Sequence, residues 1–137
     1  MTTFWNLTLT LMREEFAICR LPPDAPEPIW AAAGPFTSVT RTSEELSVTC
    51  VASAVPEGVV AQCGWRGLKV EGPFELATTV GVLAALAGPL ASAGISVSVI
   101  STYDTDYLFI HAERLAQARL VLTEAGHRIR EADPHAL

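Results

Sequence analysis

The spacing of apolar and polar residues predicts strands in the first half of the chain. Residues 6–11 alternate strictly between polar and apolar side chains, and residues 16–21 are rich in residue types that favour strands. The charged residues 13–15 between them predict a turn, so the pair is expected to form a hairpin. Three prolines within residues 22–26 end this pairing, because proline has no backbone N–H to donate. A short helix over residues 28–33 is predicted to follow.

A second hairpin is predicted before the middle of the chain. Residues 37–41 and 46–51 are both typical of strands, and the polar residues 42–45 join them. Residues 56–62 then predict one or two helical turns. Since no clear linker follows, the pattern favours two subdomains packed on a common core over independent domains.

The second half of the chain has a more regular pattern. Residues 65–70 predict a strand, and a helix is expected after it. Leu83, Leu86 and Leu90 have helical spacing and are predicted to share the buried face of this helix. Pro89 lies inside the helix and lacks an N–H, so it leaves a carbonyl one turn earlier without its helical partner.

Two further strands and a second helix complete this half. Residues 95–99 and 106–110 predict strands, and the polar residues 101–105 predict the turn of their hairpin. The second helix begins near Ala112, and a last edge strand is expected over residues 127–130. The apolar stripe of the second helix consists of Leu115, Ala118 and Leu122. The resulting order of strand, helix, strand, strand, helix, strand predicts the split βαβ architecture.

Composition and charge narrow the function classes. The chain has 137 residues, of which 50% are hydrophobic, and a formal net charge of −6. Its nine Lys and Arg residues are scattered, so neither nucleic acid nor an anionic membrane is an expected partner. No signal peptide or long apolar segment is present, and the protein is predicted to be cytoplasmic. Cys19, Cys50 and Cys63 form no C-x-x-C pair and are interpreted as small buried hydrophobes.

The sequence does not favour catalysis. Ser101, Asp106 and His111 are the residue types of a triad, but no nucleophile elbow surrounds the serine, and strand alternation places Asp106 and His111 on opposite faces. His111, His127 and His135 lack the spacing of metal ligands, and the glycines form no phosphate-binding motif. The chain is therefore predicted to be no enzyme, with no catalytic residues, no metal and no cofactor.

Two segments have the chemistry of small-molecule binding. Gly81 stands where a loop enters the first long helix, and the backbone N–H groups of residues 79–82 could attract a carboxylate there. A tight turn without a ligand explains this glycine equally well. Residues 101–106 all carry hydroxyl or carboxylate groups, and Asp106 at the strand start is the candidate partner for an ammonium group. A solvated turn is the simpler interpretation for Asp104.

Several of these segments resemble the ACT domain, a regulatory module that binds amino acids. The resemblance lies in residues 71–73, 81–84, 89–91, 93–96 and 100–107, and in the first half in residues 16–22 and 37–48. Together they are similar to the small tandem ACT proteins of bacteria, which are related to the ACT pairs of aspartate kinases and of the cytosolic arginine sensors of the TOR pathway.

The resemblance implies an α+β fold of two ferredoxin-like, ACT-type βαββαβ subdomains. Each would have an antiparallel sheet with helices packed on one face. The expected boundaries are an N-terminal ACT-like subdomain at residues 1–64, a C-terminal ACT subdomain at residues 65–133, and a tail at residues 134–137.

The resemblance also implies a ligand site and a function. In this family the loop before the first helix and the polar hairpin hold an amino acid between ACT units. The matching positions here are Thr78, Thr79, Gly81, Val82, Thr102, Thr105 and Asp106. The expected function is a non-catalytic regulatory module that binds an amino acid, with a ligand-free protein interaction module as the alternative. We also expect a homodimer with Trp5, Trp30 and Trp65 as anchors, and a partner protein that it regulates.

Overall fold

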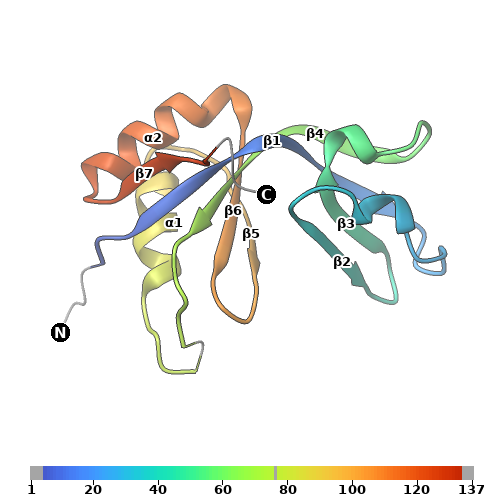
Figure 1. The fold of residues 1–137 in the computed structure, drawn as a ribbon, viewed down its shortest axis with the longest axis horizontal. Coiled ribbons are helices and arrows are strands. Elements are labelled where there is room, and N and C mark those ends of the chain that lie inside the picture. The colour runs from blue at the N-terminus through green and yellow to red at the C-terminus, as the bar shows by residue number, and fades with distance from the viewer. Residues whose placement is uncertain (1–4, 76, 134–137) are drawn as a thin grey trace. The chain divides into compact units, whose positions relative to one another are not determined.

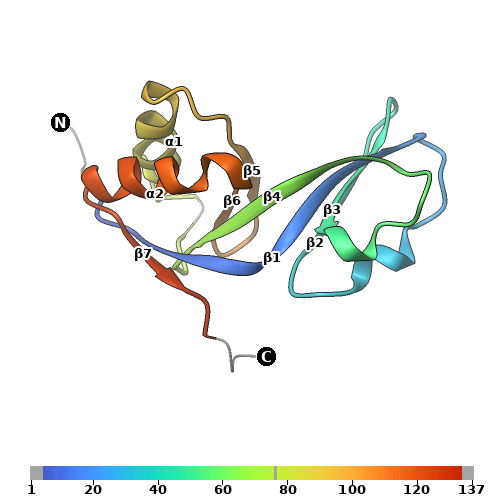
Figure 2. The same ribbon diagram turned by 90° about the horizontal axis from the view of Figure 1, so that it is seen from above.

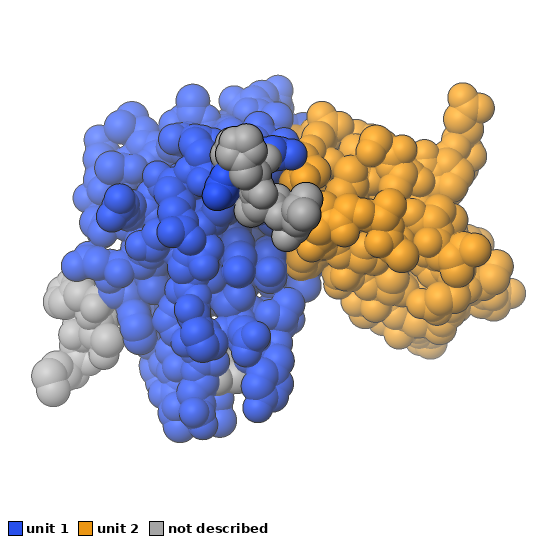
Figure 3. Space-filling model, in the orientation of Figure 1, with its two compact units in different colours: residues 1–13, 66–137 blue, residues 14–65 orange. Residues whose placement is uncertain are grey.

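The computed structural model describes residues 5–75 and 77–133, which form two compact units (Figure 1). Unit 1 contains the described parts of residues 1–13 and 66–137, and unit 2 contains residues 14–65 (Figure 3). The described residues 5–13 thus belong to the same unit as the C-terminal half, and the subdomain boundaries at residues 64 and 133 stay predictions. The predicted tail at residues 134–137 lies outside the described residues.

Two long strands, β1 (Thr8–Leu21) and β4 (Val60–Val70), each contribute to both units. The chain enters unit 2 along β1 and returns to unit 1 along β4, so these neighbouring strands run antiparallel. The hairpin predicted within residues 6–21 is wrong, because β1 continues through the charged residues 13–15. These residues include no Gly, Pro or Asn to form a turn, and distant strands pair with both ends of β1.

Unit 1 has the predicted order of helices and strands. After β4 come α1 (Val82–Ser92), β5 (Ser98–Ser101), β6 (Asp106–His111), a 3-10 turn at Ala112–Arg114, α2 (Leu115–Glu124) and β7 (Arg128–Glu131). The predicted hairpin is confirmed, with Ser101 opposite Asp106 in an antiparallel register. The last strand, β7, pairs in parallel with the beginning of β1, so Thr8 lies opposite Arg128. Strand β1 therefore lies between β4 and β7 in this unit.

The helices α1 and α2 lie over the sheet of unit 1 (Figure 2), and the core fills the space between them. In α1 the buried side chains are Val82, Leu86 and Leu90, whereas Leu83 is 42% exposed. The prediction that Leu83 is buried is therefore wrong. The buried side chains of α1 follow one another at intervals of four residues, and Leu83 lies one residue outside this series. The predicted stripe of α2 is confirmed for Ala118 and Leu122, both fully buried. Leu115 is only partly buried against the core.

The end of α1 explains why β5 starts later than predicted. The backbone N–H of Ile95 donates to the carbonyl of Leu90, 2.9 Å away, and that of Gly94 donates to Ala91. Gly94 has a φ of 71°, as glycine after a helix commonly does. Since Ile95 closes the helix and is buried in the core, pairing between β5 and β6 begins only at Ser98.

Pro89 leaves the Ala85 carbonyl without its helical partner, and the side chain of His127, just before β7, contacts this carbonyl instead. His127 Nε2 lies 2.9 Å from the carbonyl oxygen of Ala85, and His127 Nδ1 accepts the N–H of Leu7 at 3.2 Å. Because Nδ1 accepts, Nε2 must be the nitrogen that carries the proton. His127 is 5% exposed and so joins α1 to the start of β1 inside the core.

Unit 2 consists of halves of β1 and β4 together with β2 (Thr37–Arg41) and β3 (Leu46–Val51). The predicted second hairpin is confirmed, with Thr37 opposite Cys50. Residues 14–65, all described, form no α-helix: the predicted helix at 28–33 is a 3-10 turn at Ile29–Ala32, a second such turn spans Ala52–Ala54, and residues 60–62 already belong to β4. The βαββαβ order predicted for the N-terminal half is therefore not found in unit 2.

One hydrophobic cluster in unit 2 is built mainly from small side chains. It consists of Ala17, Cys19, Ala31, Leu46, Val48 and Cys50, and the larger Phe16, Phe36 and Trp65 are also buried in this unit. The prediction of buried cysteines is confirmed for Cys19 and Cys50 but is wrong for Cys63, which is exposed on β4. Residues 22–35 contain five prolines, so no stretch there is long enough to sustain a helix.

Candidate ligand site

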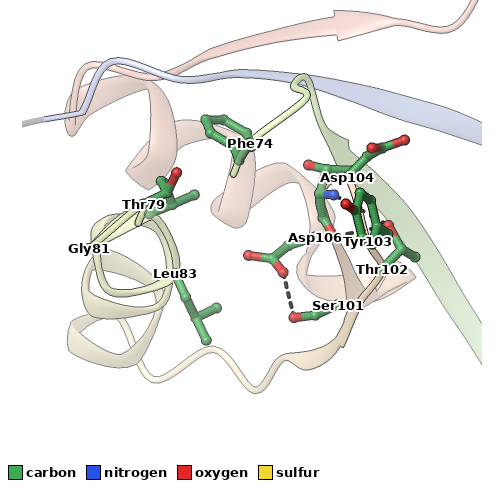
Figure 4. Close-up of a pocket in the computed structure, with 11 residues that line it drawn as sticks. Phe74, Thr79, Gly81, Leu83, Ser101, Thr102, Tyr103, Asp104 and Asp106 are labelled. Carbon is green, nitrogen blue, oxygen red and sulfur yellow. Dashed lines mark hydrogen bonds between the residues drawn. The ribbon is translucent and has the colours of Figure 1, made fainter. Parts of the chain in front are cut away.

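Unit 1 has a pocket between the start of α1 and the β5–β6 hairpin (Figure 4). Its volume is about 230 Å³, which suits a metabolite smaller than a typical drug. The pocket is lined by Phe74, Thr79, Gly81, Val82, Leu83, Ser101, Thr102, Tyr103, Asp104, Thr105 and Asp106. Two walls thus face each other, the helix start on one side and the hairpin on the other.

The helix wall is built around Gly81, the residue that precedes α1. Gly81 has a φ of 89°, a left-handed conformation that glycine adopts without strain. No described side chain caps this end of α1, and the first N–H groups of any α-helix lack partners within the helix. The N–H of Thr79, however, donates to the Glu75 carbonyl at 2.9 Å, so it is not one of the open donors predicted for residues 79–82. The first turn of α1 still offers open donors, because its N–H groups have no partners within the helix.

Asp106 is the acidic group of the hairpin wall. The hydroxyl of Ser101 donates to Asp106 Oδ1 at 2.5 Å, which holds the carboxylate in place. Figure 4 shows the Asp106 carboxylate extending from the hairpin toward the α1 side of the pocket, with Ser101 below it. One carboxylate oxygen therefore remains for a ligand. The Asp104 carboxylate points away from α1 in the same view.

Two threonines shape the hairpin rather than presenting hydroxyls to the pocket. The Thr102 hydroxyl donates to the Thr105 carbonyl and accepts the Thr105 N–H, at 3.2 and 3.3 Å, which closes the turn. The Thr105 hydroxyl donates to the Val70 carbonyl at the end of β4, and Thr105 is buried. Both side chains are thus already hydrogen-bonded within the protein.

Phe74 forms the apolar side of the pocket. Its N–H donates to the Asp104 carbonyl at 2.7 Å, so the loop after β4 is bonded directly to the hairpin. Gly72 permits this contact, because a Cβ there would lie 3.1 Å from the Asp104 carbonyl oxygen. Leu83 from α1 adds a second apolar surface.

The electrostatic character of the pocket is acidic. Asp104 and Asp106 line it, and none of the described lining residues is Lys, Arg or His. The start of α1 contributes only the partial positive charge of the helix dipole. The pocket therefore offers a full negative charge to a cation and only backbone donors to an anion.

The structure brings together six of the seven predicted site residues, namely Thr79, Gly81, Val82, Thr102, Thr105 and Asp106, while Thr78 does not line the pocket. Ligand binding by these residues remains a prediction. The sequence interpretation missed Phe74 and Leu83, since nothing local distinguishes Phe74 and the helical spacing assigned Leu83 to the core. Ser101, Tyr103 and Asp104 belong to the polar run of residues 101–106, and all six residues of that run line the pocket.

Neither a metal centre nor a triad is found among the described residues. No group of three or more His, Cys, Asp or Glu residues within 5–75 and 77–133 is arranged to hold a metal ion. Ser101 and Asp106 are bonded to each other, but His111 at the far end of β6 lies 3.8 Å from Glu113 instead of at the pocket. Neither helix of the described chain is long and apolar enough to cross a bilayer.

Comparisons with known proteins identify the family. A family model described as the ACT domain matches residues 60–124, and a second model, described as an N-terminal domain, matches residues 14–58. A crystal structure of an Agobacterium tumefaciens protein is 32% identical, with a TM-score of 0.88, over 97% of this chain and 98% of that one. No curated protein matches the sequence. The chain belongs to the ACT domain family.

More distant structures share the fold. A Vibrio cholerae protein is 24% identical with a TM-score of 0.71, over 88% of this chain and 91% of that one. The regulatory subunit of aspartate kinase from Thermus flavus is 16% identical with a TM-score of 0.60, over 90% of this chain and 99% of that one. The second comparison agrees with the predicted relation to the ACT regions of aspartate kinases.

Proposed function

We propose that this chain is a non-catalytic regulatory module whose pocket binds a free amino acid. The observation that carries the proposal is that one small pocket has a full negative charge on one wall and the partial positive charge of a helix start on the opposite wall. The Asp106 carboxylate lies on the hairpin wall, and the uncapped start of α1 lies on the other. An α-amino acid has an ammonium and a carboxylate group that match these two walls.

Each end of the ligand has an assigned partner in this proposal. The ammonium group binds the Asp106 oxygen that Ser101 leaves open, and the ligand carboxylate accepts N–H groups of the first turn of α1. Each charge-assisted hydrogen bond contributes roughly 1.5–3 kcal/mol. The ligand side chain then contacts Phe74 and Leu83. Because the described lining has no cationic side chain, neutral and basic amino acids are favoured over aspartate and glutamate.

The family supports a regulatory role. The regulatory subunit of aspartate kinase shares this fold, and a module of this kind acts by changing the state of a partner protein when its ligand binds. We therefore propose an amino acid as the ligand and a regulated protein as the partner. The proposed location is the cytoplasm.

The proposed assembly is a homodimer, but its predicted aromatic anchors need correction. Trp65 is only 7% exposed, and Trp5 packs against Phe74 within unit 1. The better candidate contact is β5, which ends the strand order and so presents an edge to a second copy. Sedimentation that shows a monomer at all concentrations would exclude the dimer.

A thermal-shift screen against the twenty amino acids tests the function, since a ligand that binds only the folded state raises the melting temperature. Calorimetry then compares Asp106→Asn with the matched control Asp104→Asn. We expect Asp106→Asn to weaken binding about tenfold or more and Asp104→Asn to change it little, because one lost charge-assisted bond is worth that factor. An amine without a carboxylate, such as cadaverine beside lysine, should bind more weakly. If no amino acid binds, the ligand-free interaction module becomes the better account.

A further inference from the structure

Trp5 contacts residues of the pocket wall, although it lies far from them in sequence. Its indole N–H donates to the Val80 carbonyl at 2.9 Å, across a separation of 75 residues. Its ring meets Phe74 edge to face, with centroids 5.9 Å apart and planes at 85°. A Cβ on Gly81 would lie 3.5 Å from the indole nitrogen. Trp5 thus contacts the loop near its beginning and again where it enters α1.

The loop that Trp5 contacts, residues 71–75 and 77–81, is here called the pocket loop. It connects β4 to α1 and supplies Phe74, Thr79 and Gly81 to the pocket. Its start is bonded to the hairpin through Phe74 and the Asp104 carbonyl. At its other end, the hydrogen bond from Trp5 to the Val80 carbonyl ties the loop to the segment before β1. The Val80 residue is itself 75% exposed.

The backbone next to Trp5 is held firmly. The N–H of Leu7 donates to His127 Nδ1 at 3.2 Å, and the Leu7 carbonyl accepts the N–H of Arg128 at 2.8 Å. The carbonyl of Thr8 accepts the N–H of Glu71, where the pocket loop begins. Trp5 is therefore attached to a fixed strand, and it can restrain the pocket loop rather than follow it.

We propose that Trp5 is the positioning residue of the pocket: it orders the pocket loop before the ligand arrives, so that Phe74 and the start of α1 already face Asp106. The inference rests on the proposed function. Ordering a loop costs conformational entropy, and a loop ordered in advance removes that cost from binding. Trp5 touches no ligand in this arrangement and acts only through Phe74 and Val80. Because it contacts Phe74, its fluorescence reports occupancy of the pocket.

The test uses the full chain with three variants. Trp5→Phe keeps an aromatic edge against Phe74 but loses the indole N–H, Trp5→Leu loses both interactions, and Trp30→Phe in unit 2 is the matched control. Hydrogen–deuterium exchange without ligand measures the order of the pocket loop. Calorimetry, well below the lowest melting temperature, measures the dissociation constant of the amino acid that shifts the wild type most. Tryptophan emission is recorded during the same titration.

We expect exchange of the hydrogen-bonded amides of the pocket loop, those of Phe74, Thr78 and Thr79, to become about tenfold faster in Trp5→Leu, because the loss of both Trp5 contacts favours local opening of the loop, while β5 and β6 keep their wild-type rates. Binding should weaken about fivefold in Trp5→Phe, the equivalent of one net hydrogen bond, and further in Trp5→Leu. The emission change on binding should persist in Trp30→Phe and vanish in Trp5→Phe.

Two results overturn the proposal. One is unchanged exchange of the pocket loop in Trp5→Leu, and the other is faster exchange with an unchanged dissociation constant, which would make Trp5 merely structural. If no amino acid binds the wild type, the proposed function fails on its own, and the exchange experiment alone decides whether Trp5 orders the loop.

Discussion

The two units use the same pair of strands and build different structures on them. In unit 1, two described α-helices cover the sheet and bury large side chains such as Leu86, Leu90 and Leu122. In unit 2, short 3-10 turns accompany the strands, and one buried cluster consists mainly of small side chains such as Ala17, Cys19 and Cys50. The family models follow the same division, because one matches residues 60–124 and a different one matches residues 14–58.

The difference explains why the candidate site lies in unit 1. An anion site of this kind needs the start of an α-helix, and a 3-10 turn such as Ile29–Ala32 is too short to provide one. A hollow in unit 2 is lined by Glu14, Glu15, Val51, Ala52, Ser53 and Cys63, which offer acidic groups without an opposing donor wall. Recognition of a zwitterion is therefore expected in unit 1 alone.

The largest expected effect separates the core of unit 1 from its pocket. Leu86 is fully buried, and Leu83, three residues earlier on the same helix, is 42% exposed. Leu86→Ala should lower the free energy of unfolding by about 2–5 kcal/mol, because it leaves a cavity. Leu83→Ala should lower it by less than about 0.5 kcal/mol. Equilibrium denaturation of both variants checks this, and equal losses would contradict the assignment of Leu83 to the pocket.

The next effect concerns His127, which joins α1 to the segment before β1 in unit 1. His127→Ala removes the partners of the Leu7 N–H and the Ala85 carbonyl and should cost about 1–3 kcal/mol of unfolding free energy. In a Pro89→Ala background, the new N–H can bond the Ala85 carbonyl, so His127→Ala should cost about 1 kcal/mol less there. Denaturation of the two single variants and the double variant measures this coupling. Strictly additive losses would mean that His127 does not compensate for Pro89.

A smaller effect tests the polar network on β1, β4 and β7. Glu71 accepts the Thr10 hydroxyl at 2.7 Å and lies 3.4 Å from Arg130. Partial burial by itself would raise the pKa of Glu71, but the bond from Thr10 and the charges of Lys69 and Arg130 outweigh it and hold this pKa below its usual value. A lowered pKa means that the carboxylate stabilises the fold above the unfolded-state pKa, and that this is lost as the pH falls through the folded-state pKa.

Glu71→Gln should therefore cost about 0.5–1 kcal/mol at neutral pH, and this cost should shrink at acidic pH as the wild-type carboxyl becomes protonated. Denaturation at the two pH values gives the comparison. A constant difference between wild type and variant would show that the charge of Glu71 has no part in stability.

The last prediction concerns the reactivity of the three cysteine thiols and not the stability of the fold. It measures how often unit 2 opens. Burial, and then the neighbouring Cys50 thiol, raises the pKa of Cys19 to about 12, and burial also raises the pKa of Cys50. Since the thiolate is the reactive form, both should react with a disulfide reagent at pH 8 only when unit 2 opens. Exposed Cys63 should react first, and Cys63→Ser should remove that fast phase. Three equal rates would mean that unit 2 opens freely.

Local sequence signals identified most of unit 1. Hairpin turns and helix ends depend on a few neighbouring residues, so Gly94, Gly126 and the polar run before Asp106 could be interpreted correctly. The family resemblance pointed to both walls of the pocket. Phe74 escaped notice, because its role follows from where the loop folds back and not from any periodicity.

By its own pattern, the sequence determined the order of strands and helices after residue 65 and the hairpin of β2 and β3, since these depend on contacts between near neighbours. Only the tertiary structure decided that β1 is one strand, that Leu83 faces a pocket, and that unit 2 has no α-helix. These outcomes depend on partners distant in sequence: β7 and β3 along β1, the hairpin across from Leu83, and the pairing of β3 with β1 and β2 in unit 2. Pairing and packing of distant segments outweigh local propensity wherever burial favours them.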